Sequence, residues 1–233
     1  MGAVKSLISE ELSARPKSYG SLEEFEEDNP DYIEDVSKSL TPEEQFALHH
    51  YTGYTFAQNN SVARGFWDYE KLGPRTPERE ARVMEENDTI SRTIDKTPAP
   101  QKGFIAYRGT NLDGFRGYGI HSIADLAKLR NGFMLDKGFI STSIVRENSF
   151  ADQEEGGYLI GASNIEVRYH VPANYRTGVG LFTRDLSHTP EETEYLINSQ
   201  TLMFVSEVTF DKEGHAIIDA IVIPKEVYDN PQQ

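Results

Sequence analysis

The pattern of polar and hydrophobic positions predicts mainly helices in the first half of the chain and mainly strands in the second. In the first half, a hydroxyl residue is followed three positions later by a glutamate at residues 21–24 and 41–44, which is the capping-box signature of a helix start. Thr76 and Pro77 repeat a cap followed by proline at the first helical position. We therefore expect helices to begin near residues 22, 42 and 77, with the third breaking near Asn87 and Asp88 and a further helical turn or two over residues 89–95.

The pattern changes from helical to strand-like at residues 97–100, whose sequence is Thr-Pro-Ala-Pro. Prolines end a helix and favour extended backbone in the residue before them. Beyond this point, short runs rich in β-branched and aromatic residues predict strands, interrupted by one helix over residues 122–129. Helices followed by a mostly antiparallel sheet predict an α+β fold. The expected strands cover residues 103–108, 138–144, 164–171, 194–197, 202–210 and 216–223.

The same pattern predicts the domain organisation. Residues 1–20 have little periodicity, and we expect a flexible N-terminal arm there. Residues 21–233 are expected to form a single domain, because the chain shows no internal repeat and its length can bury a sizeable core. Within that domain, residues 21–96 are expected to be mainly helical and residues 97–233 mainly β.

Composition narrows the range of functions. The formal net charge of −15 disfavours nucleic acid as a partner, because phosphates would be repelled, and makes a basic protein surface a more natural one. Solubility alone is the other explanation of this acidity. With no cysteine, the chain has neither disulfides nor thiolate chemistry. Its six histidines recur at no ligand spacing, so no metal site is expected.

The hydropathy of the chain predicts a soluble protein, which we expect to be a monomer. No apolar run approaches the length of a membrane span. Residues 1–18 lack the apolar core of a secretory signal, so no signal peptide is expected.

Candidate chemistry lies in three short strings, each beside a strand-like run: Tyr107-Arg108-Gly109, Ser141-Thr142-Ser143 and Glu192-Thr193-Glu194. Arg108 ends an expected strand, and Gly109 would let the backbone turn and leave the guanidinium facing a cleft. The planar fork of arginine suits bidentate contact with phosphate. An arginine at a strand end can equally pair with one of the many acids of this chain.

The hydroxyl cluster is unusual inside an apolar strand. Alternation places Ser141 and Ser143 on one face of the strand and Thr142 on the other. A cleft wall would use these hydroxyls, whereas a buried face would leave them short of partners. An edge strand that tolerates them is the alternative.

The paired carboxylates are the sharpest feature of the sequence. At the start of an expected strand, the side chains of Glu192 and Glu194 leave the same face about 7 Å apart. Two acids on one face repel, so a purely structural role is poorly motivated. With Glu191 they could instead form a solvated acidic loop after Pro190.

Together these strings resemble the motifs of mono-ADP-ribosyltransferases of the arginine-serine-glutamate class, a group of bacterial binary actin-modifying toxins, arginine-specific toxins, and phage and effector enzymes. The resemblance runs from about Tyr51 to Ile223. It implies the ADP-ribosyltransferase fold, with a two-sheet β core around an NAD cleft. Its parts are a helical lead-in at Tyr51-Thr52-Gly53, Asn59-Asn60 and Arg64-Gly65, the arginine motif at 107–109, the serine motif at 141–143 and the biglutamate motif at 192–197.

The resemblance also implies a role for each motif. Arg108 would contact the pyrophosphate of NAD or its nearby ribose. Ser141 would brace the nicotinamide ribose and the catalytic glutamate, while Thr142 and Ser143 shape the strand. Glu194 would hydrogen-bond the ribose 2′-hydroxyl and stabilise the positive charge that develops as nicotinamide leaves. The remaining residues expected to bind NAD, as a substrate and without a metal, are Tyr51, Tyr107, Gly109 and Phe150.

Glu192 bears on the acceptor. In the resembled family a glutamate at this position goes with arginine as acceptor, whereas glutamine goes with asparagine or cysteine. A carboxylate can clamp a guanidinium through two hydrogen bonds and take its proton as the new bond forms. We therefore expect catalysis by Arg108, Ser141, Glu192 and Glu194 of ADP-ribose transfer from NAD to an arginine of a target protein.

Some positions match the resembled toxins less well than the three motifs do. Phe150 resembles the aromatic residue that stacks near nicotinamide in the binary toxins, or is a core phenylalanine. Gln153 stands where those toxins often have an arginine, and Gly138 stands where an asparagine often precedes the serine motif. Arg146 or Arg184 is a candidate for the missing cation.

Two other functions fit the same residues. One is NAD hydrolysis, or transfer to an acceptor other than arginine. The other is a non-catalytic virion or adaptor domain with a vestigial NAD site, against which the intact motifs argue. The segment 184–190, with His188, is expected to meet the target protein, although His188 can also be a solvated loop residue. The resemblance implies action in the cytoplasm of a host or target cell after injection, virion delivery or secretion.

Overall fold

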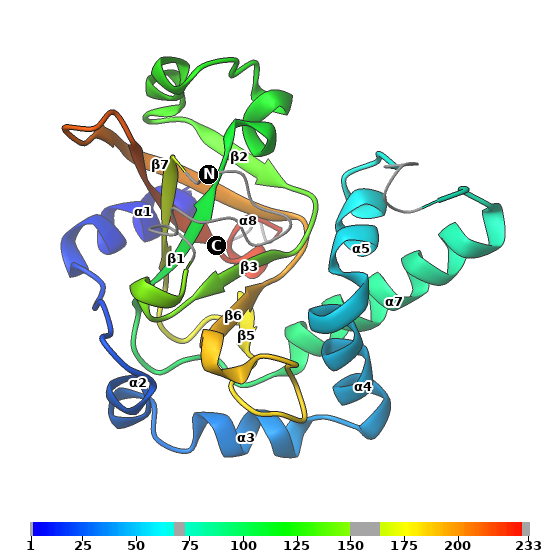
Figure 1. Ribbon diagram of the computed structural model, residues 1–233. Coiled ribbons are helices and arrows are strands. Elements are labelled where there is room, and N and C mark those ends of the chain that lie inside the picture. Colours follow the sequence, from blue (N-terminus) through cyan, green and yellow to red (C-terminus); the bar gives the residue numbers. More distant parts are fainter. Residues whose placement is uncertain (1, 68–72, 150–163, 230–233) are drawn as a thin grey trace.

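The structure is a computed structural model that describes residues 2–67, 73–149 and 164–229. Helices dominate its first part and one large sheet its second (Figure 1). The helices are α1 Gly2–Ala14, α2 Leu22–Asp28, α3 Tyr32–Ser39, α4 Pro42–His50, a π-helix Tyr51–Thr55, α5 Phe56–Ala63, α7 Pro77–Lys96 and α8 Lys225–Tyr228. The strands are β1 Phe104–Thr110, β2 Phe133–Asp136, β3 Ile140–Ser143, β4 Ile165–Val171, β5 Gly178–Gly180, β6 Glu194–Ile197, β7 Thr201–Phe210 and β8 Ala216–Ile223.

The predicted helix starts are confirmed, and their caps have the predicted chemistry. The Ser21 side chain accepts a hydrogen bond from the backbone N–H of Glu24, so α2 begins at Leu22. Thr41 and Glu44 form a complete capping box, and α4 begins at Pro42. The Thr76 side chain accepts from the backbone N–H of Arg79, and α7 begins at Pro77. Local hydrogen bonding therefore fixes where these helices start.

The predicted break near Asn87 and Asp88 is wrong, because α7 runs unbroken from Pro77 to Lys96. Val83, Ile90 and Ile94 are buried at helical spacing on one side of this segment. The Asn87 side chain donates to the carbonyl of Asn59 in α5 at 3.0 Å. Tertiary packing thus overrides the low helix propensity of asparagine and aspartate.

The predicted flexible arm over residues 1–20 is also wrong, since the chain there forms α1 and then runs beside the sheet. Val4 and Leu7 are buried and pack with Ile221 and Ile223 of β8. The contact joins the two ends of the sequence, so the local pattern of residues 1–20 carries little sign of it. The hydrophobic contact area, rather than strong periodicity, stabilises this helix.

The strands form one mostly antiparallel sheet with the order β2-β7-β8-β4-β1-β3-β6-β5. Among the ladders of the described residues, the one between β4 and β8 is parallel and the others are antiparallel. The α+β prediction is confirmed. The two-sheet core is a correction: the sheet is continuous, although β1 and β3 are joined by a single register pair, Tyr107 with Ser143. This narrow junction lets the β3-β6-β5 end and the β2-β7-β8-β4-β1 end take different directions, as in Figure 1.

Several helices pack beside the sheet, near the strands that carry the three motif strings. In Figure 1, α4, α5 and α7 stand together beside the sheet, while α2 and α3 cross one end. Phe25 of α2 packs edge-on against Phe104 of β1, and Phe104 packs edge-on against Tyr195 of β6. These buried rings tie the two ends of the sheet together across the β1–β3 junction.

Other elements differ from expectation in detail. The predicted helix at residues 122–129 is a 3₁₀ helix, Ile123–Leu129, capped by Ser122. The short elements α3, β2, β5 and α8 were not predicted, since runs of three to eight residues carry little pattern. In the part of the chain that the structure describes, no helix is long and apolar enough to cross a membrane.

Candidate active site

The order of the strands brings the three strings together. Strand β3 lies between β1 and β6, so the serine string has the arginine string on one side and the second glutamate on the other. Register places Ser143 opposite both Tyr107 of β1 and Glu194 of β6. Residues far apart in the sequence therefore share one short stretch of the sheet.

Arg108 is half-buried, and its Nη1 donates to the carbonyl oxygen of Ser141 at 2.8 Å. The predicted turn at Gly109 is wrong, because β1 continues to Thr110 and the Gly109 N–H donates to the carbonyl of Ser149 at 2.8 Å. A guanidinium has five N–H donors, so one hydrogen bond to a carbonyl orients the Arg108 side chain and leaves further N–H groups for other acceptors.

Tyr107 lies opposite Ser143 in the β1–β3 register, but its hydroxyl has a different partner. Alternation along β1 puts its side chain on the opposite face from Arg108. Tyr107 is buried, and its hydroxyl hydrogen-bonds to that of Ser18. The Tyr107 hydroxyl is therefore engaged by Ser18 rather than by the side chains of Arg108 or Glu194.

The three hydroxyls of the serine string have different partners. The Ser141 hydroxyl is within hydrogen-bonding reach of both the Tyr51 hydroxyl and the Glu194 carboxyl. Thr142 donates to the carbonyl of Tyr195 at 2.5 Å, and Ser143 donates to the carbonyl of Val145 at 2.8 Å. The buried hydroxyls of Thr142 and Ser143 are thus satisfied within the fold, and Ser141 is the one aimed at the carboxyl.

Glu194 opens β6 and is 7% exposed. Burial raises the pKa of its carboxyl to about 7, and the negative charge of Glu192 adds to this rise. The hydrogen bond to Ser141 and the positive charge of Arg108 oppose it without cancelling it. A carboxyl balanced between its two protonation states near neutral pH responds strongly to a positive charge placed beside it.

Glu192 does not lie on the strand, so the prediction that both glutamates leave one strand face is wrong. It ends a 3₁₀ turn, Pro190–Glu192, and Thr193 takes the left-handed conformation with φ of 49° before β6 begins. Proline at the first position of the turn stops the strand from extending backwards. The charge of Glu192 nevertheless raises the pKa of Glu194, so the two carboxyls lie close enough to interact.

The turn that carries Glu192 is held by several hydrogen bonds. The Asn148 side chain donates to the carbonyl of Glu191 at 2.9 Å and to the hydroxyl of Thr193 at 3.2 Å. The hydroxyls of Thr193 and Ser143 lie 2.8 Å apart. A non-glycine residue at positive φ is uncommon, and it persists here because these contacts over-determine it. Burial raises the pKa of Glu192, and the charge of Glu191 adds to the rise.

Helical residues complete the site from the other side. Tyr51, in the π-helix, is fully buried, and burial followed by the charge of Glu194 raises the pKa of its hydroxyl to about 12. Asn60 of α5 donates to the Tyr51 hydroxyl at 2.9 Å and accepts from the backbone N–H of Phe139 at 2.7 Å. One asparagine thus ties the π-helix to the residues that lead into β3.

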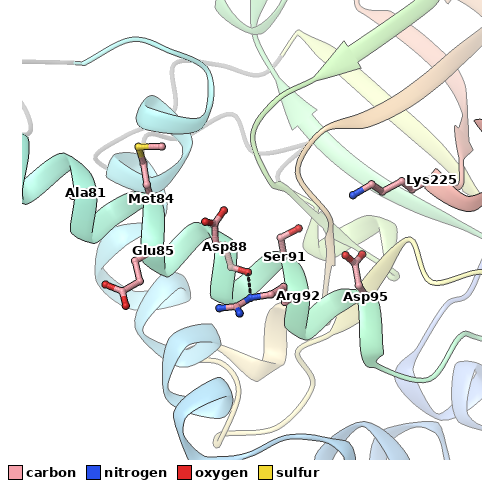
Figure 2. A pocket seen from close by; sticks show the side chains of 8 residues that line it. All are labelled: Ala81, Met84, Glu85, Asp88, Ser91, Arg92, Asp95 and Lys225. Atoms are coloured by element: carbon pink, nitrogen blue, oxygen red, sulfur yellow. Dashed lines mark hydrogen bonds between the residues drawn. The ribbon is translucent and has the colours of Figure 1, made fainter. Parts of the chain in front are cut away.

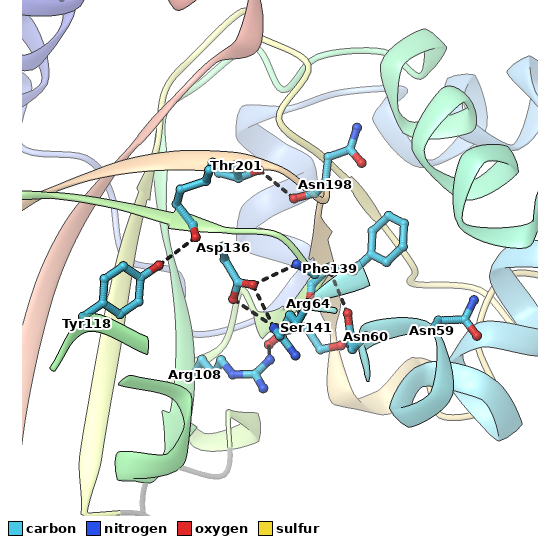
Figure 3. Close-up of polar contacts among 12 residues, drawn as sticks. Asn59, Asn60, Arg64, Arg108, Tyr118, Asp136, Phe139, Ser141, Asn198 and Thr201 are labelled. Carbon is cyan, nitrogen blue, oxygen red and sulfur yellow. Dashed lines mark hydrogen bonds and ion pairs between the residues drawn. The ribbon is translucent and has the colours of Figure 1, made fainter. Parts of the chain in front are cut away.

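Arg64, the residue that caps the C-terminal end of α5, forms a bidentate pair with Asp136 at the end of β2 (Figure 3). Its Nε and Nη2 donate to the two carboxylate oxygens at 2.9 and 3.0 Å. Burial alone would lower the pKa of Arg64, but the hydrogen bond and charge of Asp136 raise it above its ordinary value. Asp136 was not among the predicted site residues. The feature that could have identified it is an Asx-type turn, in which its side chain accepts a hydrogen bond from the backbone N–H of Gly138 at 2.9 Å.

This pair explains the glycine at position 138. A Cβ atom added there would lie 2.6 Å from the Asn60 side-chain oxygen and 2.8 Å from the Arg64 guanidinium carbon. Both neighbours are held in place by the bonds just described, so a larger residue would have to displace them. The glycine that departs from the resembled pattern is therefore required by the local packing of this chain.

Other predicted residues are placed outside this cluster or outside the described residues. Phe150 and Gln153 lie outside the described residues. Arg146 forms an ion pair with Glu166 at 2.6 Å, and Arg168 shares the same carboxylate at 2.5 Å. Arg184 is exposed in the segment before the Pro190–Glu192 turn.

Two further features lie apart from the motif residues. A groove of about 650 Å³ lies between α7 and Lys225 at the start of α8 (Figure 2). Among the described residues, one group has its possible metal-ligand atoms close together, at the β7–β8 turn: Asp211, Glu213 and His215. The groove is lined by Ala81, Met84, Glu85, Asp88, Ser91, Arg92, Asp95 and Lys225.

Comparison with known proteins identifies the fold and the family. Residues 27–225 match the family model of the ADP-ribosyltransferase exoenzymes. The chain is similar in structure to C3stau2 from S. aureus, solved with NAD, with a TM-score of 0.67, 19% identity, and coverage of 90% of this chain and 99% of that one. It is similar to the C3 exoenzyme of Clostridium limosum, with a TM-score of 0.61, 18% identity, and coverage of 89% and 97%.

The likeness extends to part of a larger toxin. The enzymatic component C2-I of the Clostridium botulinum C2 toxin matches with a TM-score of 0.61 and 20% identity, over 88% of this chain and 48% of that one. The sequence matches no curated protein. Because the family model covers most of the chain, the protein belongs to the ADP-ribosyltransferase exoenzyme family, and the predicted fold and resemblance are confirmed.

Proposed function

We propose that the chain transfers ADP-ribose from NAD to an arginine side chain of a target protein and releases nicotinamide. The family supports ADP-ribose transfer from NAD. The observation that carries the choice of arginine is Glu192, a carboxylate on a braced turn two residues before Glu194 and close enough to affect its pKa. A guanidinium is the acceptor that a carboxylate recognises best, through two parallel hydrogen bonds.

In this proposal the bond between nicotinamide and its ribose breaks first. Nicotinamide leaves with the bonding electron pair, and the ribose carbon is left with oxocarbenium character. Glu194 stabilises this cation as a carboxylate, and Ser141 keeps the carboxyl in position through its hydroxyl. Because the developing positive charge of the ribose stabilises the ionised form of Glu194, the carboxyl, whose pKa is about 7, is ionised as this charge develops.

Arg108 holds the dinucleotide. Its Nη1 is fixed on the carbonyl of Ser141, which directs the guanidinium along the wall that also carries Glu194. Its other donors bind the pyrophosphate or the neighbouring ribose. Tyr51 and Asn60 hold the opposite wall, because their hydrogen bond joins the π-helix to α5.

Glu192 acts on the acceptor. Its carboxylate binds the guanidinium of the target arginine, aims one nitrogen at the ribose carbon, and takes the proton that this nitrogen loses as the new carbon–nitrogen bond forms. Burial raises the pKa of Glu192, and this makes it a better proton acceptor than an ordinary exposed glutamate.

The experiment is an incubation of the protein with NAD, with and without a free arginine analogue. Release of nicotinamide together with ADP-ribosylated analogue supports the proposal. Nicotinamide release without transfer identifies an NAD hydrolase or an enzyme with another acceptor. The absence of release identifies a vestigial site. Mass spectrometry of lysate proteins labelled from NAD then gives the acceptor residue and the target together.

A further inference from the structure

Four aromatic rings form a continuous row on the surface beside the Pro190–Glu192 turn. Phe46 and Tyr54 are 67% and 74% exposed. The ring of Phe46 stacks on His50 with centroids 5.5 Å apart, His50 lies 6.1 Å from Tyr54, and Tyr54 meets His188 edge-on at 5.0 Å. We call Phe46, His50, Tyr54 and His188 the aromatic ridge.

The ridge follows from helix geometry at one end and from a close backbone approach at the other. Phe46, His50 and Tyr54 are spaced by four residues along α4 and the π-helix, which puts them on one side. His188 comes from a distant loop, and its ring lies over Gly53, where an added Cβ would be 2.2 Å from the ring. The glycine is therefore needed for the loop to reach the helices.

Polar contacts and stacking fix the ridge in place. His50 Nδ1 lies 2.9 Å from a carboxylate oxygen of Glu86. The backbone N–H of His188 donates to the Thr52 hydroxyl at 3.2 Å, and the His188 ring lies 3.9 Å from that of His49. Ordered exposed rings lose little conformational freedom when a partner binds, which favours a binding role over an incidental exposure.

The ridge is continuous with the site through the chain itself. The backbone N–H of Glu192 donates to the carbonyl of Thr189, the residue after His188. A protein whose arginine reaches Glu192 must therefore lay its neighbouring surface near His188 and Tyr54. The ridge borders the position that the acceptor residue has to occupy.

The charges around the ridge indicate the chemistry of that neighbouring surface. Asp185 and Glu191 are exposed in the same loop, and Glu43 is exposed at the start of α4. Carboxylates attract lysine and arginine through their charge, and exposed aromatic rings attract them through cation–π contact. The net charge of −15 acts in the same direction over longer distances.

We propose that the aromatic ridge docks a basic segment of the target protein that flanks the acceptor arginine. The proposal rests on the proposed function for the identity of the acceptor, but the docking itself does not require catalysis. The site thus has two parts: Glu192 binds the acceptor arginine, and the ridge selects the sequence around it.

The test uses two fluorescent peptides, each with one arginine, flanked in one by lysines and in the other by glutamates. Binding is measured by anisotropy at low ionic strength without NAD. The ridge variant is Phe46→Ser with Tyr54→Ser. The matched control is Phe210→Ser, which removes a 44%-exposed phenylalanine at the end of β7. All three substitutions lie on the surface, and unchanged thermal unfolding shows that the two variants are folded.

The wild-type chain and the control are expected to bind the lysine-flanked peptide at least about tenfold more tightly than the glutamate-flanked one, and the ridge variant to lose about tenfold in affinity for the lysine-flanked peptide. Nicotinamide release from NAD alone should be equal in all three. Equal peptide affinity in the wild type and the ridge variant would overturn the proposal. So would a loss caused instead by Glu85→Gln with Asp88→Asn, which removes charge from the α7 groove. Failure of the proposed function is distinguishable, because it appears as absent nicotinamide release or transfer while peptide binding is still measured.

Discussion

Two arginine–carboxylate arrangements lie at the site, and they differ in how completely the charges are neutralised. Arg64 gives two N–H groups to the carboxylate of Asp136, at 2.9 and 3.0 Å. Arg108 gives its Nη1 to a backbone carbonyl and acts on Glu194 through its charge. The first carboxylate is held in a bidentate pair, whereas burial leaves the second with a pKa of about 7.

The difference separates a structural pair from a reactive group. A carboxylate engaged by two N–H donors has its charge compensated, so a substrate cation arriving nearby changes its interactions little. Glu194 is buried without such a partner, and its ionisation becomes favourable when a positive charge develops beside it. The site therefore combines a fixed frame, built on Arg64, with a carboxyl whose interactions are completed by the reaction.

Glu194→Gln removes the charge on which the reactive carboxyl depends, and we expect the largest effect from it. The amide keeps the shape but cannot carry the negative charge, so both ADP-ribose transfer and NAD hydrolysis should fall at least about 1,000-fold. NAD binding, measured by calorimetry, should persist, since Arg108 and the surrounding wall are unchanged. Nicotinamide release gives the rate. Substantial remaining transfer would contradict the role of Glu194.

Glu192→Gln tests the second carboxylate of the reactive region. Transfer to a free arginine analogue should fall about 100-fold, because glutamine cannot accept the guanidinium proton. Hydrolysis of NAD should stay within a few-fold of the wild-type rate, because Glu194 and Ser141 remain. Glu191→Gln is the matched control, since it removes an exposed charge one residue away. Unchanged arginine modification by the Glu192 variant would exclude the clamp.

The reactive residues of the site were more predictable from the sequence than the Arg64–Asp136 pair that forms its fixed frame. Arg108, Ser141 and Glu194 each sit in a short string beside a strand-like run, and strand pairing brings them together. The position of Glu192 was not predictable from strand alternation, because Pro190 and the left-handed Thr193 form a turn instead. Short-range patterns identify which residues matter here, while turn conformation decides where they point.

The frame depends on contacts that no local pattern encodes. Arg64 and Asp136 are 72 residues apart in the chain. Arg64 belongs to the resembled helical lead-in, but no sequence pattern links it to Asp136. The glycine at position 138 departs from the resembled pattern, and the reason for it is its close contact with Arg64 and Asn60, which come from a distant part of the chain. The docking of α1 on β8 was missed for the same reason, as it joins the two ends of the sequence.

The raised pKa of Glu194 also makes the folding stability depend on pH. The ordinary glutamate pKa is 4.5, and burial raises that of Glu194 to about 7 in the folded chain. Below pH 4.5 the carboxyl is protonated in both the folded and the unfolded chain, so its burial does not lower the free energy of unfolding. As pH rises from 4.5 to 7 the unfolded chain ionises first, so folding stability is lost, by about 3 kcal/mol in total. Glu194→Gln should therefore match the wild type at pH 4 and exceed its free energy of unfolding by about 3 kcal/mol at pH 8, measured by urea titration. An equal stability of the two at pH 8 would contradict the raised pKa.

Asp136→Asn makes the same chemical change in the frame, and the comparison predicts the opposite sign. The asparagine keeps the shape but leaves the partly buried Arg64 guanidinium without its counter-charge. We expect the free energy of unfolding at pH 8 to fall by about 2 kcal/mol, since breaking one partner of a buried pair costs more than the pair contributed. Asp88→Asn, on the exposed side of α7, is the control and should change stability by less than about 0.5 kcal/mol. If Asp136→Asn leaves stability unchanged while Glu194→Gln raises it, the Arg64–Asp136 pair is not the fixed frame of the site. Opposite signs from the two amide substitutions at one pH would show that the chain stabilises itself through one carboxylate and gives up stability at the other, where it needs a charge that only the substrate compensates.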